Sequence, residues 1–509
     1  MTSLWMPHPR PAAATPFTPG AHHDVVIVGA GLTGLSTAVL LAVDGFDVCV
    51  VDAGDVASGA SGSNTGKVSL LQGSVLSTLR AHHPAALVGA YVEANRDGQD
   101  WLLAFADAAG VPRTTHTALS YAQTVDGVGA VDDEHAAARE AGLPVRIATA
   151  AETADLPFPV ARAVALDDQS ALDPAVLTAA LAAAFVAAGG TLHTGVRATG
   201  LSVLPRPTLR TREGALTAEQ IVLATGTPIV DRGLTFAKVS GNRSYCVSFQ
   251  TPGAVPEGLY LSVDGPTRSL RPVHAGDSRL IVGGNGHPVG RIASERHQVD
   301  DLIAWTTRHF PGAQPTHRWS AQDYTSHNLV PFVGALPRGL GRVRFATGYA
   351  KWGLTNAPWA ALRLAAEIRG QAREELPRWM TMIGTRLTVP GDLARGAMEN
   401  ARVAGAAARG WLAAERHPVP VPQPGEGQGV VAQRGGAPVA ISTVDGQTRA
   451  VSAVCPHLGG VLSWNDAECT WDCPLHASRF APDGTRLEGP AVRDLPALPR
   501  RTEAPGRGY

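Results

Sequence analysis

The chain alternates short apolar runs with helical patterns, which predicts a mixed α/β protein. Residues 24–28 and 47–51 are apolar runs typical of buried parallel strands, and a helical pattern covers residues 35–43 between them. Further strand-like runs cover residues 221–226, 244–250, 258–263, 279–283 and 344–348. An Ala-rich stretch at 396–416 predicts a helix, and the Pro- and Gly-rich residues 417–429 predict a linker.

The first strand, helix and strand contain a nucleotide-binding pattern. The first run is followed at once by Gly29-Ala-Gly31-Leu-Thr-Gly34, and the second run ends in Asp52. In such a βαβ unit the glycines permit the tight turn, the approach of backbone to a pyrophosphate and close helix packing, and the acid binds ribose hydroxyls. The pattern predicts a dinucleotide site without separating FAD from NAD.

Two short loops near the end of the chain each offer one thiolate and one imidazole. The first loop is Cys455-Pro-His457, and the second is Cys473-Pro-Leu-His476. Two Cys on one iron and two His on the other are the ligands of a Rieske [2Fe–2S] centre. A structural zinc site is the alternative, but zinc fingers usually pair Cys with Cys and His with His. The surrounding sequence resembles the Rieske family over roughly residues 425–500.

Departures from that family bear on the redox potential. Rieske proteins of respiratory complexes carry two further cysteines that join the loops, and Gly460 and Leu475 stand at those positions here. Ser478 occupies the position of a hydroxyl that hydrogen-bonds the cluster, whereas Phe480 replaces a Tyr. Hydrogen bonds to sulfur raise a potential that spans roughly −150 to +300 mV in this class, so we expect a low-to-middle value.

Three further segments distinguish between cofactors. A small-residue loop over residues 58–67 follows the second strand, and two later strands end in Ala-Thr-Gly at Gly226 and Gly348. With the fingerprint, these segments resemble the D-amino-acid oxidase, glycine oxidase and sarcosine oxidase family of FAD enzymes over about residues 24–390. The resemblance implies FAD, with a helix N-terminus at the flavin pyrimidine. The FAD-binding positions it implies are Gly29, Gly31, Gly34, Asp52, Ser61, Thr65, Gly66, Lys67, Gly226, Gly348, Lys351, Gly353, Leu354 and Thr355.

The resemblances imply an α/β FAD-binding (Rossmann-like) domain with an interleaved mixed-sheet substrate domain, and a small all-β C-terminal Rieske domain. The expected boundaries are a disordered tail at 1–23, an oxidoreductase at 24–395, a linking helix and linker at 396–429 and the Rieske domain at 430–509. Within the oxidoreductase, residues 24–95, 150–232 and 325–395 are assigned to FAD. Residues 96–149 and 233–324 are assigned to substrate.

Length, charge and cysteine content indicate the number of domains, the kinds of partner and the cellular compartment. A length of 509 residues suggests two or three domains, and a net charge of −1 gives no electrostatic case for nucleic acid or membrane binding. We find no apolar run long enough for a transmembrane helix and no signal peptide. Five cysteines, of which Cys49, Cys246 and Cys469 are not assigned to the cluster, fit a reducing cytoplasm.

Candidate substrate contacts come from the rarer residue types. Only three lysines occur among 43 basic residues, and Lys67 and Lys351 lie in segments expected at the flavin, whereas Lys238 does not. His287 and His327 lie in segments expected to approach the substrate cleft, and with the two flavin lysines they are the candidate catalytic residues. Cations that could bind an anionic group are Arg243, Arg268 and Arg271, each of which would by default be a surface residue.

One substitution argues against a simple α-amino acid as substrate. Relatives often anchor the substrate carboxylate with a Lys at the position of Thr355. The resemblance implies oxidation of a C–N bond in an amine or amino-acid-like substrate, with electrons leaving through the Rieske cluster to a carrier such as a ferredoxin. A reductase using the same relay in reverse, and an electron-transfer or redox-sensing protein without a substrate, are the alternatives.

Overall fold

The computed structural model describes residues 1–6, 15–230, 233–384, 390–416 and 422–498. The chain divides into two units. Unit 1 comprises Met1–Gly286 and Gln298–Ala394, and unit 2 comprises His287–His297 and Arg395–Tyr509. Unit 2 therefore takes a short segment from the middle of the chain in addition to the C-terminal part.

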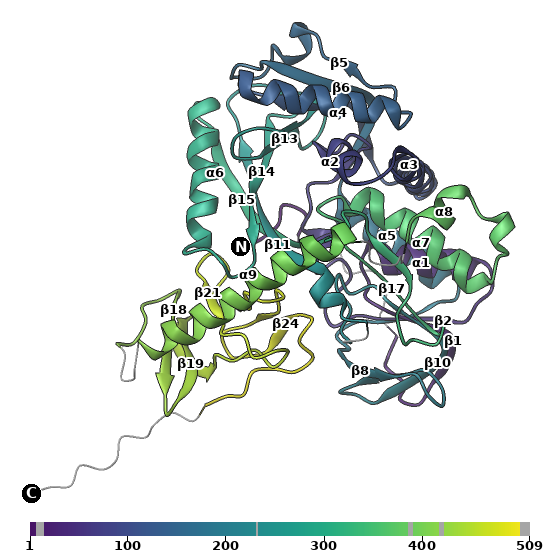
Figure 1. The fold of residues 1–509 in the computed structure, drawn as a ribbon, viewed down its shortest axis with the longest axis vertical. Coiled ribbons are helices and arrows are strands. Elements are labelled where there is room, and N and C mark those ends of the chain that lie inside the picture. The colour runs from purple at the N-terminus through teal and green to yellow at the C-terminus, as the bar shows by residue number, and fades with distance from the viewer. Residues whose placement is uncertain (7–14, 231–232, 385–389, 417–421, 499–509) are drawn as a thin grey trace, which may run out of the picture. The chain divides into compact units, whose positions relative to one another are not determined.

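The first sheet of unit 1 has eight strands, in the order β16-β17-β10-β1-β2-β7, with β9 paired to β10 and β8 to β9. Its strands are β1 (His22–Val28), β2 (Val48–Val51), β7 (Thr191–His193), β8 (Ala198–Ser202), β9 (Thr208–Thr211), β10 (Ala215–Leu223), β16 (Phe332–Ala335) and β17 (Val343–Thr347). Strands β7, β2, β1, β10 and β17 pair in parallel. Their continuous apolar sequences are explained by helices α1 (Leu32–Val43), α5 (Pro174–Ala187) and α7 (Gly353–Arg369), which pack into the same core (Figure 1).

The second sheet of unit 1 has nine strands, in the order β15-β11-β14-β13-β12-β4-β6-β3, with β5 paired to β6. Its strands are β3 (Lys67–Val68), β4 (Arg113–Ala122), β5 (Arg146–Ile147), β6 (Arg162–Leu172), β11 (Val239–Gln250), β12 (Leu259–Ser262), β13 (Arg268–Pro272), β14 (Arg279–Pro288) and β15 (Gln314–Ser326). One face packs against helix α6 (Glu295–His309), whose Val299 and Leu302 share a core with Tyr245 and Phe249 of β11. The other helices are α2 (Val75–His82), α3 (Ala85–Ala108), α4 (Val128–Glu140) and α8 (Arg378–Met382).

The division between the sheets differs in two places from the sequence-based boundaries. Strand β3 lies within residues 24–95, expected in the FAD part, yet it pairs with β6 of the second sheet. Strand β6 lies within residues 150–232, expected in the FAD part, yet it pairs along its length with β4 of the second sheet. A pairing of this kind leaves no local signal in the sequence, because α4 and β5 separate β4 from β6 along the chain.

The N-terminal residues also differ from the expected disordered tail. Thr2 pairs with Arg318 of β15, and Trp5 is 3% exposed. The Trp5 indole N–H donates to the Asn64 carbonyl at 2.7 Å, and the ring packs edge-on to Trp319. Burial of this aromatic side chain supplies the free energy that orders residues 1–6, which the Pro-rich composition concealed. Residues 7–14 of the expected tail lie outside the described residues.

Unit 2 contains a three-stranded sheet and a four-stranded sheet. The first comprises β18 (Gln428–Arg434), β19 (Ala437–Val444) and β20 (Gln447–Ser452), and the second β21 (Ser463–Asn465), β22 (Thr470–Asp472), β23 (Arg479–Phe480) and β24 (Arg486–Glu488). Helix α9 (Pro390–Glu415), observed where the sequence predicts a helix, adds Ala406 to the core formed by these sheets.

The segment His287–His297, here called the arm, is held to the rest of unit 2 by polar contacts. Arg291 forms an ion pair with Glu399 of α9 at 2.7 Å and donates to the Pro474 carbonyl at 2.8 Å. The Ser294 hydroxyl donates to Asp466 at 2.6 Å. The arm thus supports the loop that contains Cys473 and His476.

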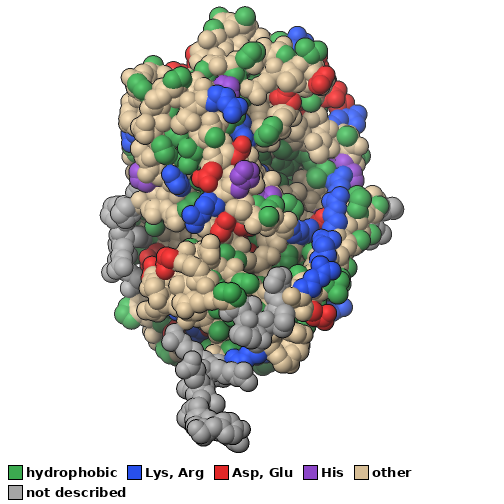
Figure 2. All heavy atoms as spheres, turned by 90° about the vertical axis from the view of Figure 1, so that its left-hand side faces the viewer, with side chains coloured by type: hydrophobic (Ala, Val, Ile, Leu, Met, Phe, Trp, Pro, Cys, Tyr) green, Lys and Arg blue, Asp and Glu red, His purple; other side chains and the backbone are tan. Residues whose placement is uncertain are grey.

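The described surface is mixed in charge. Basic and acidic side chains are scattered among each other over the face drawn in Figure 2, apart from a short row of basic groups at its right edge. Among the described residues, no helix combines the length and the apolar character needed to cross a membrane.

Candidate functional site

The glycines of the first βαβ unit occupy positions that exclude any side chain. Gly29 has φ +115°, and a Cβ there would lie 2.4 Å from the Ala224 carbonyl oxygen. A Cβ at Gly34 would lie 1.9 Å from the Gly29 carbonyl oxygen, so only glycine lets α1 approach the end of β1. A Cβ at Gly31 would lie 2.8 Å from the Ser61 hydroxyl. These close approaches form the backbone cradle that a dinucleotide pyrophosphate needs.

Asp52, at the end of β2, lies beside that cradle. Its carboxylate accepts the Ala30 N–H at 2.6 Å and the Gly54 N–H at 2.8 Å. Burial raises the pKa of Asp52, against the opposing effect of these two backbone donors. An acid fixed at the end of the second strand fits the recognition of a ribose, so the residues present fit FAD.

The small-residue loop crosses between the two sheets. Ser61 accepts the Leu32 N–H at the start of α1 at 3.0 Å. Gly66 has φ +73°, and a Cβ there would lie 2.1 Å from the Leu172 carbonyl oxygen. The Thr65 carbonyl accepts a hydrogen bond from Arg271 of β13. The loop is thereby anchored to the second sheet as well as to α1.

The later glycine segments meet the same region. Gly226, with φ +73°, follows β10, and its carbonyl accepts a hydrogen bond from the Thr347 hydroxyl. Gly348 has φ +89°, and the Tyr349 hydroxyl that follows lies 2.9 Å from that of Thr33 in α1. These contacts bring the start of α7 next to the start of α1.

The first turn of α7 contains the last three positions that the resemblance assigns to FAD. Gly353 begins the helix and Leu354 is buried. Thr355 is fully buried, and its hydroxyl accepts from Gln72 at 2.9 Å. The side chain of Thr355 therefore serves the protein interior, which leaves backbone groups to face a cofactor.

Lys67 and Lys351 lie on the same face of the second sheet. The Lys67 ammonium donates to the Tyr260 carbonyl at 2.8 Å and to the Ser269 hydroxyl at 2.6 Å. Burial, and then the charge of Arg271, lowers the pKa of Lys67 to about 7. Burial raises the pKa of the Cys246 thiol to about 12, against the charges of Lys67 and Lys351, so this thiol is close to both lysines.

Asp323 is a candidate site residue that the sequence interpretation missed. It lies on β15 opposite Asn242 of β11, and its carboxylate accepts the backbone N–H of Lys351. Burial raises the pKa of Asp323 to about 6. The available signal was an acid within Trp319–Ser326, a run otherwise free of charge, whereas the sequence interpretation selected the next residue, His327.

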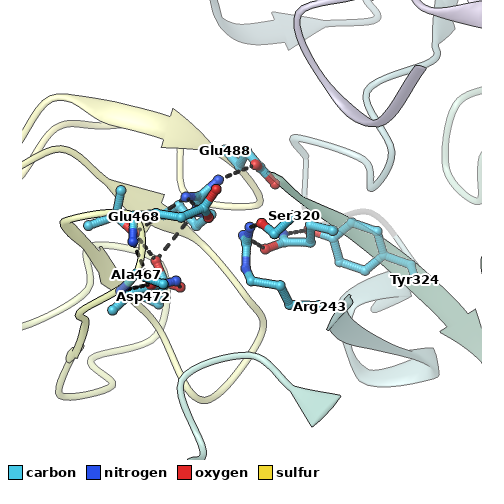
Figure 3. A network of polar contacts seen from close by, with 11 residues as sticks. Arg243, Ser320, Tyr324, Ala467, Glu468, Asp472 and Glu488 are labelled. Atoms are coloured by element: carbon cyan, nitrogen blue, oxygen red, sulfur yellow. Dashed lines mark hydrogen bonds and ion pairs between the residues drawn. The ribbon is translucent and has the colours of Figure 1, made fainter. Parts of the chain in front are cut away.

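The three candidate arginines are all buried, contrary to the expectation of a surface position. Arg268 and Arg271 leave β13 on opposite faces, as their spacing predicts: Arg268 pairs with Asp301 of α6, and Arg271 stacks over Trp5. Arg243 donates to the Ser320 hydroxyl at 2.6 Å and to the Gln322 amide oxygen at 2.8 Å (Figure 3). Neighbouring polar groups on the sheet make these burials possible.

The two candidate histidines and Lys238 lie in different settings. His327 Nε2 lies 3.1 Å from the Ser240 hydroxyl, and its backbone N–H donates to the Lys238 carbonyl. His287 belongs to the arm of unit 2, where its Nδ1 lies 2.9 Å from the Pro288 carbonyl. The structure thus groups Lys67, Lys351 and Asp323 on one sheet face of unit 1 and puts His287 in the other unit.

The four expected cluster ligands converge within unit 2. The sulfurs of Cys455 and Cys473 lie within hydrogen-bonding reach of each other, and the rings of His457 and His476 lie 5.1 Å apart. Burial, then the charge of His457, lowers the pKa of His476 to about 4, which favours the neutral imidazole that binds metal. A pair of sulfurs and a pair of imidazoles fit a two-iron cluster in which each iron takes two protein ligands.

The residues that distinguish this cluster site from respiratory ones lie around the same loops. A Cβ at Gly460 would lie 2.6 Å from Leu475 Cγ, so these two positions are adjacent and contain no cysteine pair. The Ser478 hydroxyl reaches the Cys455 sulfur and accepts the Ala491 N–H at 2.9 Å. Phe480 is fully buried.

The second ligand loop is anchored by a buried ionic network. Arg479, which follows that loop, contacts Glu468 at 2.6 Å, Glu488 at 2.8 Å and Asp472 at 3.4 Å (Figure 3). Asp472, which precedes Cys473, is 1% exposed and also accepts from Asn465 and Thr470. These contacts fix both ends of the loop.

Comparison with known proteins matches both parts of the chain. The family model "FAD dependent oxidoreductase" (DAO) matches residues 24–367, and "Rieske [2Fe-2S] domain" matches residues 418–499. A Bacillus subtilis protein named as a Rieske 2Fe-2S iron-sulfur protein, YhfW, is 28% identical over 93% of this chain and 92% of its own. An iron-sulfur subunit of the cytochrome b6-f complex from Synechococcus is 47% identical over 9% of this chain and 26% of its own.

Solved structures share the fold of unit 1. Glycine oxidase from Geobacillus kaustophilus superposes with a TM-score of 0.59 at 21% identity, covering 69% of this chain and 96% of that one. L-proline dehydrogenase from P. horikoshii also gives 0.59, at 16% identity, covering 70% and 95%. Since the DAO model matches more than half of the chain, the protein belongs to the FAD dependent oxidoreductase family, and it carries a C-terminal Rieske [2Fe-2S] domain.

Proposed function

We propose that this protein oxidises a C–N bond in an amine or amino-acid-like substrate and passes the electrons through its cluster to an external one-electron carrier such as a ferredoxin. The observation that carries the proposal is the presence of the DAO fold and of the paired Cys and His loops in one chain. When bound, the flavin supplies two-electron oxidation and the cluster supplies one-electron transfer.

The substrate class is supported by the relatives and by the site. Glycine oxidase, L-proline dehydrogenase and L-amino acid deaminase share the fold of unit 1, and each is named for an amino-acid substrate. Charged groups on one face of the second sheet, Lys67, Lys351 and Asp323, provide the donors and the acceptor that would orient a small polar substrate. The start of α7 provides free backbone N–H groups, which stabilise negative charge.

The proposed function assigns a binding role to each sheet of unit 1 and to the cluster loops of unit 2. The first sheet, with α1 and the start of α7, would hold FAD, and the second sheet would form the floor of the substrate site. Cys455, His457, Cys473 and His476 would bind the cluster.

Anaerobic mixing with amines tests the oxidation. We expect members of a panel of amines, N-methyl amines and amino acids to bleach the flavin absorbance near 450 nm without oxygen. A reductase would instead be bleached only from the side of a reduced carrier, and a redox sensor by no amine. Either result would overturn the proposed direction.

Replacement of one cluster ligand tests the relay. In Cys455→Ser we expect the flavin still to be bleached by substrate, but turnover with a one-electron dye to fall and peroxide yield in air to rise. Cys469→Ser is the matched control, because Cys469 lies in the same unit outside the ligand loops. Equal dye turnover and equal peroxide yield in wild type and Cys455→Ser would refute the relay.

A further inference from the structure

Asp323 is a carboxylate on β15 whose two oxygens differ in their contacts. Its neighbours on β15, Gln322 and Tyr324, belong to the opposite face, where Gln322 accepts from Arg243 and donates to the Tyr324 hydroxyl. Asp323 accepts the backbone N–H of Lys351, but its Oδ2 is fully buried and has no hydrogen-bond partner among the described residues. A buried acceptor without a donor destabilises the protein, and more so when it is charged, so this oxygen is suited to a donor from a ligand.

Two further polar groups, the Ser244 hydroxyl and the Lys351 ammonium, lie on the same face of the second sheet as Asp323. Ser244, two residues along β11 from Asn242, has a buried hydroxyl that also lacks a partner among the described residues. A Cβ at Gly286 of β14 would lie 2.3 Å from the Lys351 ammonium and 3.0 Å from the Ser244 hydroxyl. The ammonium and the hydroxyl therefore flank the same point of the sheet, which only a glycine leaves open.

The backbone beside Asp323 is held in an uncommon conformation. Ala350 and Lys351 have φ +48° and +75°, a left-handed conformation that is strained in residues other than glycine. The Ala350 N–H donates to the Tyr324 carbonyl at 3.0 Å, so β15 fixes this loop directly before α7. Asp323 therefore lies beside the segment that the family fold presents to the flavin, where strain is commonly retained for function.

We propose that Asp323 is the subsite for the amino group of the substrate: it binds the ammonium form and accepts a proton from it at Oδ2, while the Ser244 hydroxyl accepts a further N–H of the same group. This inference rests on the proposed C–N oxidation. An N–H bond of the substrate breaks and an O–H bond forms on Asp323, which frees the nitrogen lone pair. The carbon next to nitrogen then loses a hydride, with bound FAD as the oxidant, and an iminium product remains.

The charges around Asp323 define the expected pH dependence. Burial raises the pKa of its carboxyl from 3.8 to about 6, while Lys351 and then Arg243 oppose this rise. The carboxylate is therefore ionised above about pH 6, whereas a simple ammonium group stays protonated up to roughly pH 10. Affinity for an ammonium ligand should be high at pH 7.5 and should fall as the pH is lowered through 6.

Binding of amines that cannot be oxidised tests this subsite without turnover. tert-Butylamine and 2-methylalanine carry no hydrogen on the carbon next to nitrogen, and their binding to the holoenzyme is measured by flavin difference spectra and by calorimetry. We expect Asp323→Asn to weaken binding of at least one of these amines tenfold or more at pH 7.5 and to abolish the fall in affinity towards pH 5. Binding of acetate should not be weakened.

Three comparisons separate this role from a structural one. Asn keeps an acceptor for the Lys351 N–H, so the loop should persist, which flavin content and near-ultraviolet circular dichroism check. Asp323→Glu keeps the charge and should retain part of the affinity and its pH dependence. Asp300→Asn, an exposed carboxylate on α6, should match wild type.

The outcomes distinguish this inference from the proposed function. Unchanged amine affinity and pH dependence in Asp323→Asn, or no amine binding by wild type, overturns the subsite, even if amines bleach the flavin. Binding that depends on Asp323 without bleaching by any oxidisable amine supports the subsite and overturns C–N oxidation as the reaction.

Discussion

Replacing Arg479 by Met should destabilise the cluster-binding loop, because this arginine is the cation shared by three carboxylates around it. The Arg479 side chain is 11% exposed and contacts three carboxylates, of which Asp472 is 1% and Glu468 15% exposed. Met has a similar length and fills the space, so the substitution removes the charge with little loss of packing. Two buried carboxylates would then face each other without a cation.

The magnitude follows from the burial of these partners. Breaking a buried ion pair by removing one member costs about 3–5 kcal/mol, because the remaining charge stays desolvated. At about 1.4 kcal/mol per factor of ten, this corresponds to roughly two to three and a half powers of ten in the opening equilibrium of the loop. The contact with Glu488, whose side chain is 36% exposed, should contribute little.

The assay follows the cluster directly. Guanidinium titration under reducing, anaerobic conditions is read from the visible circular dichroism of the cluster in Arg479→Met and wild type. Arg449→Met on β20, where the structure gives the arginine a contact with Gln447, is the control and should shift stability by no more than about 0.5 kcal/mol. If Arg479→Met lost less than about 1 kcal/mol, the network would not be what holds the loop.

For three other substitutions the structure predicts the direction of the effect. Ser478→Ala should lower the cluster midpoint potential in a redox titration, because it removes a hydrogen bond to the Cys455 sulfur; an unchanged midpoint would contradict this role. Burial lowers the pKa of Lys67 from 10.5 to about 7, so between these two pH values the unfolded chain binds more protons than the folded chain. The free energy of unfolding should therefore rise with pH from 7 to 10.5. Lys67→Met should flatten this rise in denaturant titrations. Gly34→Ala should abolish FAD retention, measured as flavin per protein, since its Cβ would lie 1.9 Å from a backbone oxygen; Gly89→Ala, which meets nothing within 4 Å on α3, should retain the flavin.

The features predicted correctly from the sequence are those encoded by short spacings. The βαβ unit around Gly29 and Asp52 is observed, because apolar runs and glycines specify it within about thirty residues. The Cys455 and Cys473 loops likewise carry their pattern in three or four positions each. Helix α9 is observed because alanines dominate its composition and outweigh its glycines.

The features that the sequence did not predict depend on partners far away in the chain. Trp5 is buried only because it packs against Trp319 of β15 and donates a hydrogen bond to the Asn64 carbonyl. Asp323 has the role of a loop anchor only because Lys351 lies beside it. The burial of Arg243 depends on β15 being the neighbour of β11. For Asp323 and Arg243 the residue type favours the surface, and tertiary pairing overrides that preference; for Trp5 the surrounding Pro-rich sequence contains no sign of the partners that bury it.

The arm makes the scaffold of the cluster discontinuous in the chain. Arg291 supports the cluster loop from 183 positions earlier in the chain than Pro474. A fragment beginning at Arg395 would contain all four cluster ligands and yet lack this arginine, so Glu399 would keep its contact with Arg402 but lose Arg291, and Asp466 would lose Ser294. The arm lies within the stretch that matches the FAD dependent oxidoreductase model, yet its side chains brace the loops of the Rieske domain, so a cluster domain excised at Arg395 should be less stable than the same domain in the full chain.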